Sequence, residues 1–409
     1  MTIGIGGSTP EQALGRLRNM LGGVEPITRD EYLMRIEKAQ LRMRQLEIEA
    51  IFLPAGSDLE YFTGTRWSPS ERMVGAILPA SGAIEYVAPT FEEGTIRDFM
   101  VVEGRINGWQ EHENPCCLLL DCLRRLGIEP SPSVQTRIGL GSSLPFFMFD
   151  GLRKLDPGYD FVDAGAVTAH CRQRKSAVEI ALMQRAKAMT LEVHKAAASI
   201  LHEGISTTEV TEFIHQAHRA VGASGSVFCI VLFGEASAFP HGVKYAQRLQ
   251  PGDMVLIDTG CRVHSYLSDI TRSYVYGEPS ARQREIWNLE KEAQLAAFAA
   301  ARLGARCEEV DAAARVHFEA SGLGPDYKLP GLPHRTGHGI GLDIHESPYL
   351  VRGDQTPLDT GMCFSNEPMI CIPGEFGVRL EDHFYMTETG PRWFTEPSHS
   401  IDDPFGLGS

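Results

Sequence analysis

The stretch SNEPMICIPGEFGVRLED, Ser365–Asp382, sets two carboxylates around a short strand-like run, Met369–Ile372. Glu367 precedes this run next to a proline, and Glu381 follows Glu367 by fourteen residues. The Pro–Gly turn at residues 373–377 predicts that two adjacent strands pair here. Such a pairing would bring both acids together, and buried carboxylates need a cation or a proton.

Further acids and histidines occur in or beside strand-like segments of the second half of the chain. Each could be structural when taken alone, as a turn residue or a core histidine. Together, four carboxylates and one imidazole form an oxygen-rich set that suits two divalent ions, between which a water becomes acidic. The set therefore predicts hydrolysis of a stable bond such as an amide. The acids are Asp258, Asp269, Glu367 and Glu381, and the histidines are His241, His334, His338 and His345.

The composition limits the class of protein. The chain has 409 residues, 43% of them hydrophobic and 22% charged, as expected of a soluble globular protein with more than one domain. The net charge of −15 argues against nucleic-acid and anionic-membrane partners. The first residues do not resemble a secretion signal. The nine cysteines lack paired spacing, which predicts neither disulfides nor a structural zinc site. We expect a reducing, cytoplasmic location.

The pattern of apolar and charged residues changes near residues 165–175. Before this point, short apolar strands such as 50–54 alternate with helices such as 115–126, which predicts a small α/β domain. After it, charged helical runs such as 175–200 flank strands rich in Gly and Asp. We predict an α+β protein with domains at residues 1–170 and 171–409, and we see no internal repeat.

Three segments of the second domain carry a family resemblance. They are VLIDTGCRVHSYLSDITRSY (255–274), RTGHGIGLDIHESPYL (335–350) and NEPMICIPGEFGVRLED (366–382). They resemble the signature blocks of the pita-bread metallopeptidases, which include Xaa-Pro dipeptidases (prolidases), Xaa-Pro aminopeptidases, methionine aminopeptidases and the metal-free creatinases. The resemblance implies a C-terminal pita-bread catalytic domain.

The resemblance also implies a role for each candidate residue. Asp258, Asp269, His338, Glu367 and Glu381 would bind two divalent ions, with Mn²⁺ favoured and Co²⁺, Zn²⁺ or Fe²⁺ as alternatives. Glu367 would also act as general base or acid. His241 and His345 would position substrate and stabilise the tetrahedral intermediate, His334 would help to bind the carboxyl end of the substrate, and Arg379 would hold the bridging carboxylate, Glu381.

The first domain carries a weaker resemblance. SDLEYFTGTRW (57–67) resembles a strand-turn of the creatinase-type N-terminal domain, and CRQRKSAVEIALMQRA (171–186) resembles the helix that joins the two domains. Methionine aminopeptidases lack this domain, so the resemblance favours the proline-specific branch and a homodimer. The implied substrate is an Xaa-Pro dipeptide or a short proline-containing peptide.

Two positions depart from the family pattern. Cys371 stands where relatives usually carry a tyrosine whose hydroxyl assists catalysis, and His264 stands where a small residue is common. The leading prediction is an Xaa-Pro dipeptidase, with an Xaa-Pro aminopeptidase, an enzyme for a non-peptide small molecule, and a non-catalytic binding protein as alternatives. The two Asp-Thr-Gly triplets, at Asp258 and Asp359, could also indicate an aspartic protease, but the flanking helical runs disfavour an all-β enzyme.

Overall fold

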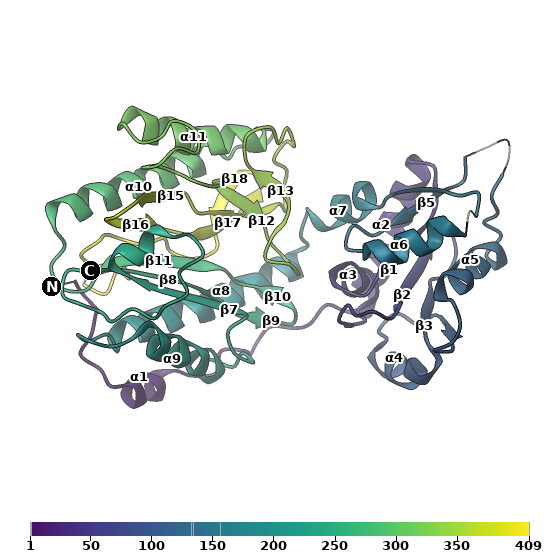
Figure 1. Cartoon of the computed structure of the whole chain (residues 1–409), viewed down its shortest axis with the longest axis horizontal. Helices are drawn as coiled ribbons and strands as arrows, with labels where there is room; N and C mark the ends of the chain where they lie inside the picture. The colour runs from purple at the N-terminus through teal and green to yellow at the C-terminus, as the bar shows by residue number, and fades with distance from the viewer. Residues whose placement is uncertain (1, 132, 134, 156, 409) are drawn as a thin grey trace. The chain divides into compact units, whose positions relative to one another are not determined.

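The chain divides into two compact units in a computed structural model that describes residues 2–131, 133, 135–155 and 157–408 (Figure 1). The smaller unit is Ile27–Arg172, and the larger unit combines Met1–Pro26 with Gln173–Ser409. We predicted that residues 1–170 form the first domain, whereas the first 26 residues pack with the larger unit. For example, the Ile3 N–H donates to the Asp402 carbonyl at 2.7 Å.

The smaller unit is a mixed sheet with helices around it. The strand order is β4-β3-β2-β1-β5-β6, with β1–β2 and β2–β3 antiparallel and the other pairs parallel. The strands are β1 (Ile48–Pro54), β2 (Gly75–Pro79), β3 (Glu85–Pro89), β4 (Arg105–Trp109), β5 (Arg137–Leu140) and β6 (Asp160–Asp163). The helices are α2 (Arg29–Gln45), α3 (Ser57–Thr63), α4 (Glu93–Phe99), α5 (Pro115–Arg125), α6 (Phe146–Lys154) and α7 (Gly165–Arg172), with a 3₁₀ turn η1 (Thr90–Glu92).

One segment of the smaller unit differs from its prediction. SDLEYFT was expected to begin a strand-turn, but Ser57–Thr63 forms helix α3. The helix ends at Gly64, whose φ of 73° is left-handed and whose N–H donates to the Glu60 carbonyl at 2.8 Å. This glycine stop, and burial of the Leu59 face, outweigh the strand propensity of the aromatic residues.

The larger unit holds sheets between two helix pairs (Figure 1). Its strand orders are β11-β8-β7, β13-β12-β14-β17-β18, β15-β16 and β10-β9. Its strands are β7 (Phe228–Phe233), β8 (Met254–Gly260), β9 (Arg262–Val263), β10 (Tyr266–Leu267), β11 (Ile270–Val275), β12 (Gly337–Gly339), β13 (Glu346–Leu350), β14 (Cys363–Asn366), β15 (Met369–Ile372), β16 (Phe376–Arg379), β17 (Asp382–Thr387) and β18 (Gly390–Trp393). Its helices are α1 (Pro10–Arg16), α8 (Ala177–Ser199), α9 (Thr207–Ala220), α10 (Ala281–Ala300) and α11 (Cys307–Ala320), with a 3₁₀ turn η2 (Gly234–Ala238).

The two helix pairs, α8–α9 and α10–α11, repeat one backbone design. Gly204 and Gly304 both adopt left-handed conformations in the connecting turns, with φ of 84° and 80°. Each glycine N–H donates at 2.8 Å to a carbonyl of a later loop, that of Leu249 in one pair and Leu358 in the other. The two helix pairs are therefore alike in backbone structure, although no repeat is visible in the sequence. The repeat lies in backbone geometry, which the differing side chains of the two halves conceal.

A long β-hairpin in the second half changes partners midway. β14 pairs with β17, and β15 pairs with β16, all antiparallel. Between these two pairings lie Glu367 and Glu381, just outside the strands rather than within them. The predicted turn is present but occupies residues 373–375, because Phe376 and Gly377 already belong to β16. Pro368 stands where it removes no ladder hydrogen bond, before β15 begins. The break in the hairpin frees both acids to face away from the strand pairs.

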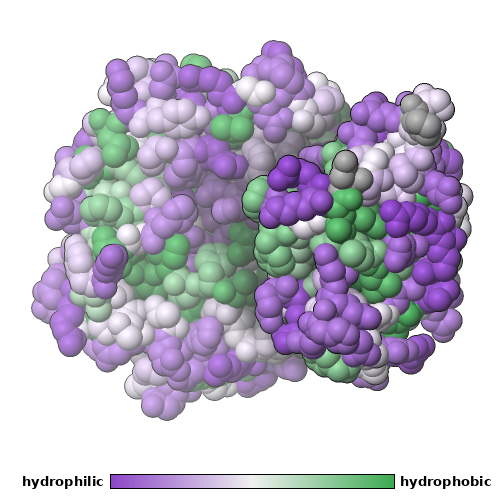
Figure 2. Space-filling view, turned by 45° about the vertical axis from the view of Figure 1, so that its right-hand side comes forward, coloured by the Kyte–Doolittle hydropathy of each residue, from purple (hydrophilic) through white to green (hydrophobic). Residues whose placement is uncertain are grey.

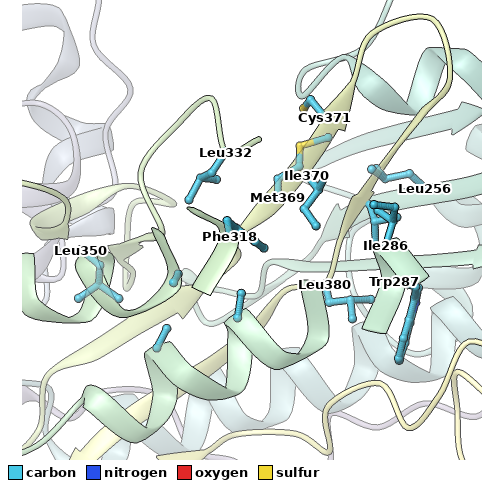
Figure 3. Packing of buried hydrophobic residues seen from close by; sticks show 14 of the residues in the cluster. Leu256, Ile286, Trp287, Phe318, Leu332, Leu350, Met369, Ile370, Cys371 and Leu380 are labelled. Carbon is cyan, nitrogen blue, oxygen red and sulfur yellow. The ribbon is translucent and has the colours of Figure 1, made fainter. Parts of the chain in front are cut away.

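The apolar core of the larger unit packs against this hairpin (Figure 3). Met369, Ile370 and Cys371 of β15 belong to the same cluster as Trp287 of α10 and Phe318 of α11. Cys371 is 1% exposed, and burial raises the pKa of its thiol to about 12. Its main chain exchanges hydrogen bonds with Gly331. The cysteine is therefore a neutral packing residue of this cluster.

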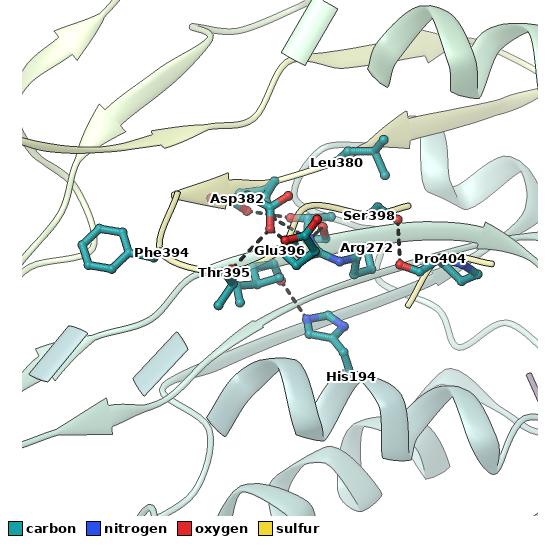
Figure 4. A network of polar contacts seen from close by, with 12 residues as sticks. His194, Arg272, Leu380, Asp382, Phe394, Thr395, Glu396, Ser398 and Pro404 are labelled. Atoms are coloured by element: carbon teal, nitrogen blue, oxygen red, sulfur yellow. Dashed lines mark hydrogen bonds and ion pairs between the residues drawn. The ribbon is translucent and has the colours of Figure 1, made fainter. Parts of the chain in front are cut away.

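A buried ion pair joins the two repeats beside the acids (Figure 4). Arg272 of β11 donates to Asp382 Oδ1 of β17 at 2.7 Å, and both side chains are 0% exposed. The same guanidinium donates to the carbonyls of Glu381 at 2.9 Å and Glu396 at 3.2 Å. Gln294 of α10 reaches the other Asp382 oxygen at 3.2 Å. Sheet, helix and C-terminal segment thus meet at one charge pair.

Polar side chains dominate the visible surface of both units, with apolar residues in scattered patches (Figure 2). This is the ordinary partition between a folded core and its surface. Within the part of the chain that the structure describes, no helix has the length and hydrophobicity to cross a membrane.

We predict that Asp382→Asn destabilises the protein by about 3–5 kcal/mol, because it leaves the fully buried Arg272 charge without its partner. Chemical denaturation of the metal-free protein measures this change. Asp359→Asn is the matched control, since the Asp359–Arg174 pair is half exposed and should contribute about 1 kcal/mol or less. Equal effects of the two substitutions would contradict the assigned role of the buried pair.

Candidate metal centre

Strands β8 and β11 bring the first two acids together. Asp258 lies within β8, where its main chain pairs with Thr271 of β11, and Asp269 directly precedes β11. The Asp-Thr-Gly triplet at Asp258 ends in Gly260, where a Cβ would lie 1.9 Å from the Ser268 carbonyl oxygen. Only glycine allows this close crossing of the chain. Asp258 and Asp269 are 7% and 5% exposed, so both are buried.

The loop between these acids contains the unexplained His264. His264 and Ser265 form the two-residue turn between β9 and β10, and their φ values are 43° and 73°. A hairpin turn with two positive φ values favours Asn, Asp or Gly, and His tolerates this conformation better than most residues. His264 therefore shapes the turn between the acids.

His338 lies in β12 and points one ring nitrogen at the acids. Its Nδ1 lies 3.0 Å from the Gly339 carbonyl, so Nδ1–H donates there and Nε2 is the nitrogen directed at the acids. Nε2 lies 3.0 Å from Glu367 Oε1 and 3.8 Å from Asp269 Oδ2. The neighbouring Gly337 approaches the main chain of Ser365, where a Cβ would lie 2.1 Å from the carbonyl oxygen. The absence of a side chain at Gly337 therefore allows strand β14 to approach closely.

The hairpin break supplies the other two acids. Glu367 Oε1 accepts from Ser365 Oγ at 3.0 Å, and Glu381 Oε2 accepts from Thr271 Oγ1 at 2.7 Å. One donor atom each of His338, Glu367 and Glu381 lie within 4.8 Å of one another. Through the Thr271–Glu381 hydrogen bond, this group also contacts β11 from the earlier half of the larger unit.

The electrostatics of this group are unfavourable for the protein alone. Among the described residues, Asp258 Oδ1, Asp269 Oδ1 and Glu381 Oε1 are buried without a hydrogen-bond partner. Burial raises the pKa of Asp258, and burial with repulsion from neighbouring acids raises the pKa of Asp269 and Glu381 well above the ordinary range. Burial also acts to raise the pKa of Glu367, but the hydrogen bond and charge of His338 lower it to about 2.

Arg379 contacts a different acid from the one expected. We expected its guanidinium to hold Glu381, but Nη2 donates to Asp258 Oδ2 at 2.6 Å. It reaches Glu381 through Thr271: Arg379 Nε donates to Thr271 Oγ1 at 3.0 Å, and that hydroxyl donates to Glu381. Nη1 also donates to the Pro240 carbonyl at 3.1 Å, which fixes the segment before His241. The cause of the difference is that β16 packs across β8.

A cavity of about 170 Å³ opens onto the acids. His241 and His345 line it with exposed side chains, and the His345 ring lies 4.2 Å from the His338 ring. Partial burial, followed by the charge of His338, lowers the pKa of His345 to about 4. Among the described residues, neither His334 nor Cys371 lines this cavity. The lining residues are Phe228, Ile230, His241, Asp258, Asp269, His338, Ile344, His345, Glu367, Arg379 and Glu381.

His334 lies instead on the loop before β12. Its Nδ1 lies 2.7 Å from the Arg335 carbonyl, and its Nε2 is buried without a partner among the described residues. Burial lowers its pKa despite the nearby charge of Glu367. The remaining eight predicted residues lie together around the cavity.

A buried ion pair that the sequence did not indicate holds this loop. Asp311 of α11 accepts from Arg315 Nε at 2.8 Å and from the N–H and hydroxyl of Thr336 at 3.1 and 2.8 Å. Arg315 Nη2 donates to the His334 carbonyl at 2.5 Å. The Thr336 carbonyl in turn accepts from the Glu367 N–H at 2.9 Å. Only the helical spacing of Asp311 and Arg315, four residues apart, could have suggested this pair.

A second buried pair holds the loop that carries His345. Lys175 donates to Glu346 Oε2 at 2.9 Å, with side chains 2% and 7% exposed. Glu346 Oε1 accepts the N–H groups of Leu342 and Asp343 at 2.9 and 3.1 Å. Glu346 therefore shapes the loop just before His345.

The donor set fits divalent metal ions. Carboxylate oxygens with one imidazole suit Mn²⁺ and related ions, and the unpartnered oxygens of three acids point to positive charge that the side chains do not supply. Asp258, Asp269, His338, Glu367 and Glu381 could hold such ions, and Arg379 compensates one negative charge only.

Together, fold and site define a metallopeptidase built on an N-terminal mixed sheet and a two-repeat catalytic unit. Residues 181–388 match metallopeptidase family M24, and residues 35–174 match the creatinase/prolidase N-terminal domain. The chain belongs to metallopeptidase family M24, and the predicted fold class, an α+β pita-bread catalytic domain after a creatinase-type domain, is confirmed.

Similar proteins span nearly the whole chain. A curated protein of Mycobacterium tuberculosis H37Rv, named "Probable dipeptidase PepE", is 34% identical over 88% of this chain and 93% of its own length. The crystal structure of dipeptidase PepE from Mycobacterium ulcerans has a TM-score of 0.83 and 32% identity, covering 92% of this chain and 99% of that one. A structure of an Xaa-Pro dipeptidase from Bacillus anthracis has a TM-score of 0.78 and 28% identity, covering 90% and 99%.

We predict that metal binding releases protons and weakens as the pH falls. The raised pKa values of Asp269 and Glu381 mean that the folded, metal-free protein binds more protons than its unfolded chain, so its stability falls as pH rises through them. A metal ion must displace these protons. Titration calorimetry with Mn²⁺ between pH 6 and 8, in buffers of different ionisation enthalpy, measures the release. A binding heat independent of the buffer would contradict it.

We also predict that Asp311→Asn lowers metal affinity roughly tenfold, because an amide cannot hold both Arg315 and Thr336 and the loop next to His338 and Glu367 loosens. Glu319→Gln, an exposed substitution on the same helix, is the matched control and should leave affinity unchanged. Metal titrations of both variants measure the difference. Wild-type affinity in a folded Asp311→Asn protein would refute the positioning role.

Proposed function

We propose that this enzyme is a dinuclear Xaa-Pro dipeptidase, with Mn²⁺ as the favoured ion and Co²⁺, Zn²⁺ or Fe²⁺ as alternatives. The observation that carries the proposal is the buried group of four acids and His338, with three unpartnered oxygens, on the wall of a small cavity. Bound to Asp258, Asp269, His338, Glu367 and Glu381, two divalent ions would supply Lewis-acid chemistry that polarises the scissile carbonyl and acidifies the attacking water.

Glu367 is the group best placed to move a proton. Its pKa of about 2 keeps it ionised at neutral pH, and Oε1 is held by Ser365 Oγ at 3.0 Å. In the proposed reaction Glu367 accepts a proton from the water that attacks the carbonyl carbon. It then delivers this proton to the proline nitrogen as the C–N bond breaks.

The histidines that line the cavity would bind and orient the substrate. With a pKa of about 4, His345 is neutral at pH 7 and can donate a hydrogen bond to the carbonyl oxygen as negative charge develops there. Arg379 Nη1 donates to the carbonyl of Pro240, the residue before His241. His241 would position the peptide. The His334 side chain lies outside the cavity wall. It would help to bind the substrate carboxylate after its loop moves.

The cavity supports a short, proline-containing substrate. Its volume of about 170 Å³ is below the roughly 300 Å³ at which pockets for drug-sized ligands begin. Phe228, Ile230 and Ile344 line it, and apolar side chains of this kind suit the pyrrolidine ring of proline. The similarity to the dipeptidase from Mycobacterium ulcerans and the Xaa-Pro dipeptidase from Bacillus anthracis supports the same substrate class.

An Xaa-Pro aminopeptidase is the second candidate, since the same catalytic group would cut a longer peptide. A homodimer and a cytoplasmic location remain predictions of the sequence, as does the choice of Mn²⁺. His241 and His345 both line the cavity, and in the proposed reaction one of these histidines takes the share of the tyrosine hydroxyl that Cys371 lacks.

The test compares substrates for chelator-stripped protein reloaded with Mn²⁺. We expect hydrolysis of Xaa-Pro dipeptides, slower hydrolysis of Xaa-Pro-Yaa tripeptides, and little of matched Xaa-Ala dipeptides. Faster cleavage of the tripeptides would favour the aminopeptidase, and inactivity on every proline peptide would refute the substrate class.

Asp258→Asn and Asp359→Asn provide a matched pair, because both alter the aspartate of an Asp-Thr-Gly triplet. The first removes a candidate ligand and should lower bound metal and kcat/KM by at least about 100-fold. The second changes a half-exposed residue whose carbonyl accepts from the Met362 N–H in a turn, and should leave both unchanged.

A further inference from the structure

His383 of β17 is a buried histidine that none of the assigned roles explains. It lies two residues after Glu381, which directly precedes the strand. The side chain is 0% exposed, and within the described residues neither Nδ1 nor Nε2 makes a hydrogen bond of good geometry, although the Asp269 main chain approaches the ring. Leaving two polar atoms buried and unpaired is unfavourable, so the ring needs a partner that the side chains do not provide.

The acids nearest to His383 have the complementary deficit. One ring nitrogen of His383 and one oxygen each of Asp269 and Glu381 lie within 4.8 Å of one another. Asp269 Oδ1 and Glu381 Oε1 are also buried without partners among the described residues. One imidazole and two carboxylates that converge in this way are the donor types that a divalent transition-metal ion binds.

This triplet mirrors the one around His338. There, His338, Glu367 and Glu381 likewise bring one imidazole and two carboxylates within 4.8 Å. Glu381 belongs to both triplets, and the two imidazole rings lie 6.2 Å apart. Both histidines therefore lie close to one shared carboxylate, Glu381.

We propose that His383 is a sixth ligand of the metal centre and binds the ion held by Asp269 and Glu381. The inference rests on the proposed dinuclear function and goes beyond its five-ligand set. Each of the two ions would then have one imidazole ligand. A second nitrogen donor makes the centre less purely oxygen-ligated, which raises affinity for Co²⁺ and Zn²⁺ relative to Mn²⁺.

Cobalt provides a direct readout of the ligand set, independent of activity. We expect the wild-type protein loaded with two Co²⁺ ions to show two hyperfine-shifted imidazole N–H signals in its proton NMR spectrum, one for His338 and one for His383. A single such signal in a protein holding two Co²⁺ ions would overturn the proposal, and this measurement needs no variant.

His383→Gln tests the same point by substitution. We expect one Co²⁺ ion to bind roughly tenfold or more weakly, the other to be unaffected, and the Co²⁺ absorption bands to change. The ratio of Co²⁺ to Mn²⁺ affinity should also fall at the weakened site. His218→Gln is the matched control, because His218 is buried in the same unit and both its nitrogens have partners, Thr190 and Ser226.

The outcomes separate this inference from the proposed function. Unchanged Co²⁺ affinity and spectrum in folded His383→Gln, alongside a wild-type protein that binds two ions and cuts Xaa-Pro peptides, would refute the sixth ligand alone. A wild-type protein that binds two ions but cuts no proline peptide would refute the substrate class. The number of shifted N–H signals would then still decide whether His383 is a ligand. A wild-type protein that binds no second ion would overturn both.

Discussion

The buried pair of Arg272 and Asp382 is the constraint on which the catalytic unit depends. It fastens β11 of the first repeat to β17 of the second with both charges fully removed from water. Asp269 lies three residues before Arg272, and Glu381 lies directly before Asp382. A buried charge pair tolerates little displacement, because loss of either contact exposes the other charge to an apolar interior. The pair therefore fixes the distance between acids that come from different halves of the chain.

Both halves of the larger unit contribute acids to the candidate metal centre. The first contributes Asp258 and Asp269 from the β8–β11 side, and the second contributes Glu367 and Glu381 from the broken hairpin. Within the described residues, Arg379 is the cation that touches one of these acids directly. The buried Lys187 of α8 donates to the Leu267 carbonyl at 3.2 Å nearby, and burial lowers its pKa to about 8. Protein cations thus offset only part of the acidic charge, and metal ions would supply the rest.

Several parts of the fold follow from local sequence. The side chains of Thr28, Ser176, Ser206 and Ser280 each accept from the N–H three residues on and begin a helix, and the helix after Ser176 agrees with the run predicted at 175–200. The hairpin turn after β15 follows from its Pro–Gly pair. Such signals act within a few residues, so they survive in any context. The helix at Ser57–Thr63 was missed because its stop, Gly64, is a weaker signal than the aromatic residues before it.

Other features have no local signal. The partner of Arg379 depends on how β16 crosses β8, and the packing of residues 1–26 depends on contacts hundreds of positions away, such as Thr2 with the Val275 carbonyl. The backbone repeat of the helix pairs is invisible because backbone hydrogen bonds place few demands on side chains. His383 escaped notice because its importance lies in the absence of partners, which only coordinates reveal.

The sequence by itself indicated the chemistry, because four acids and His338 occur in segments that resemble those of the pita-bread metallopeptidases. The tertiary structure decided which of these groups touch, which ion pairs hold them, and that His383 joins the acids. The physical reason is that residue types decide which groups can bind a metal ion, whereas the distances between buried charged groups decide which of them interact. Distances between Asp269, Glu381 and His383 exist only once the two repeats have packed.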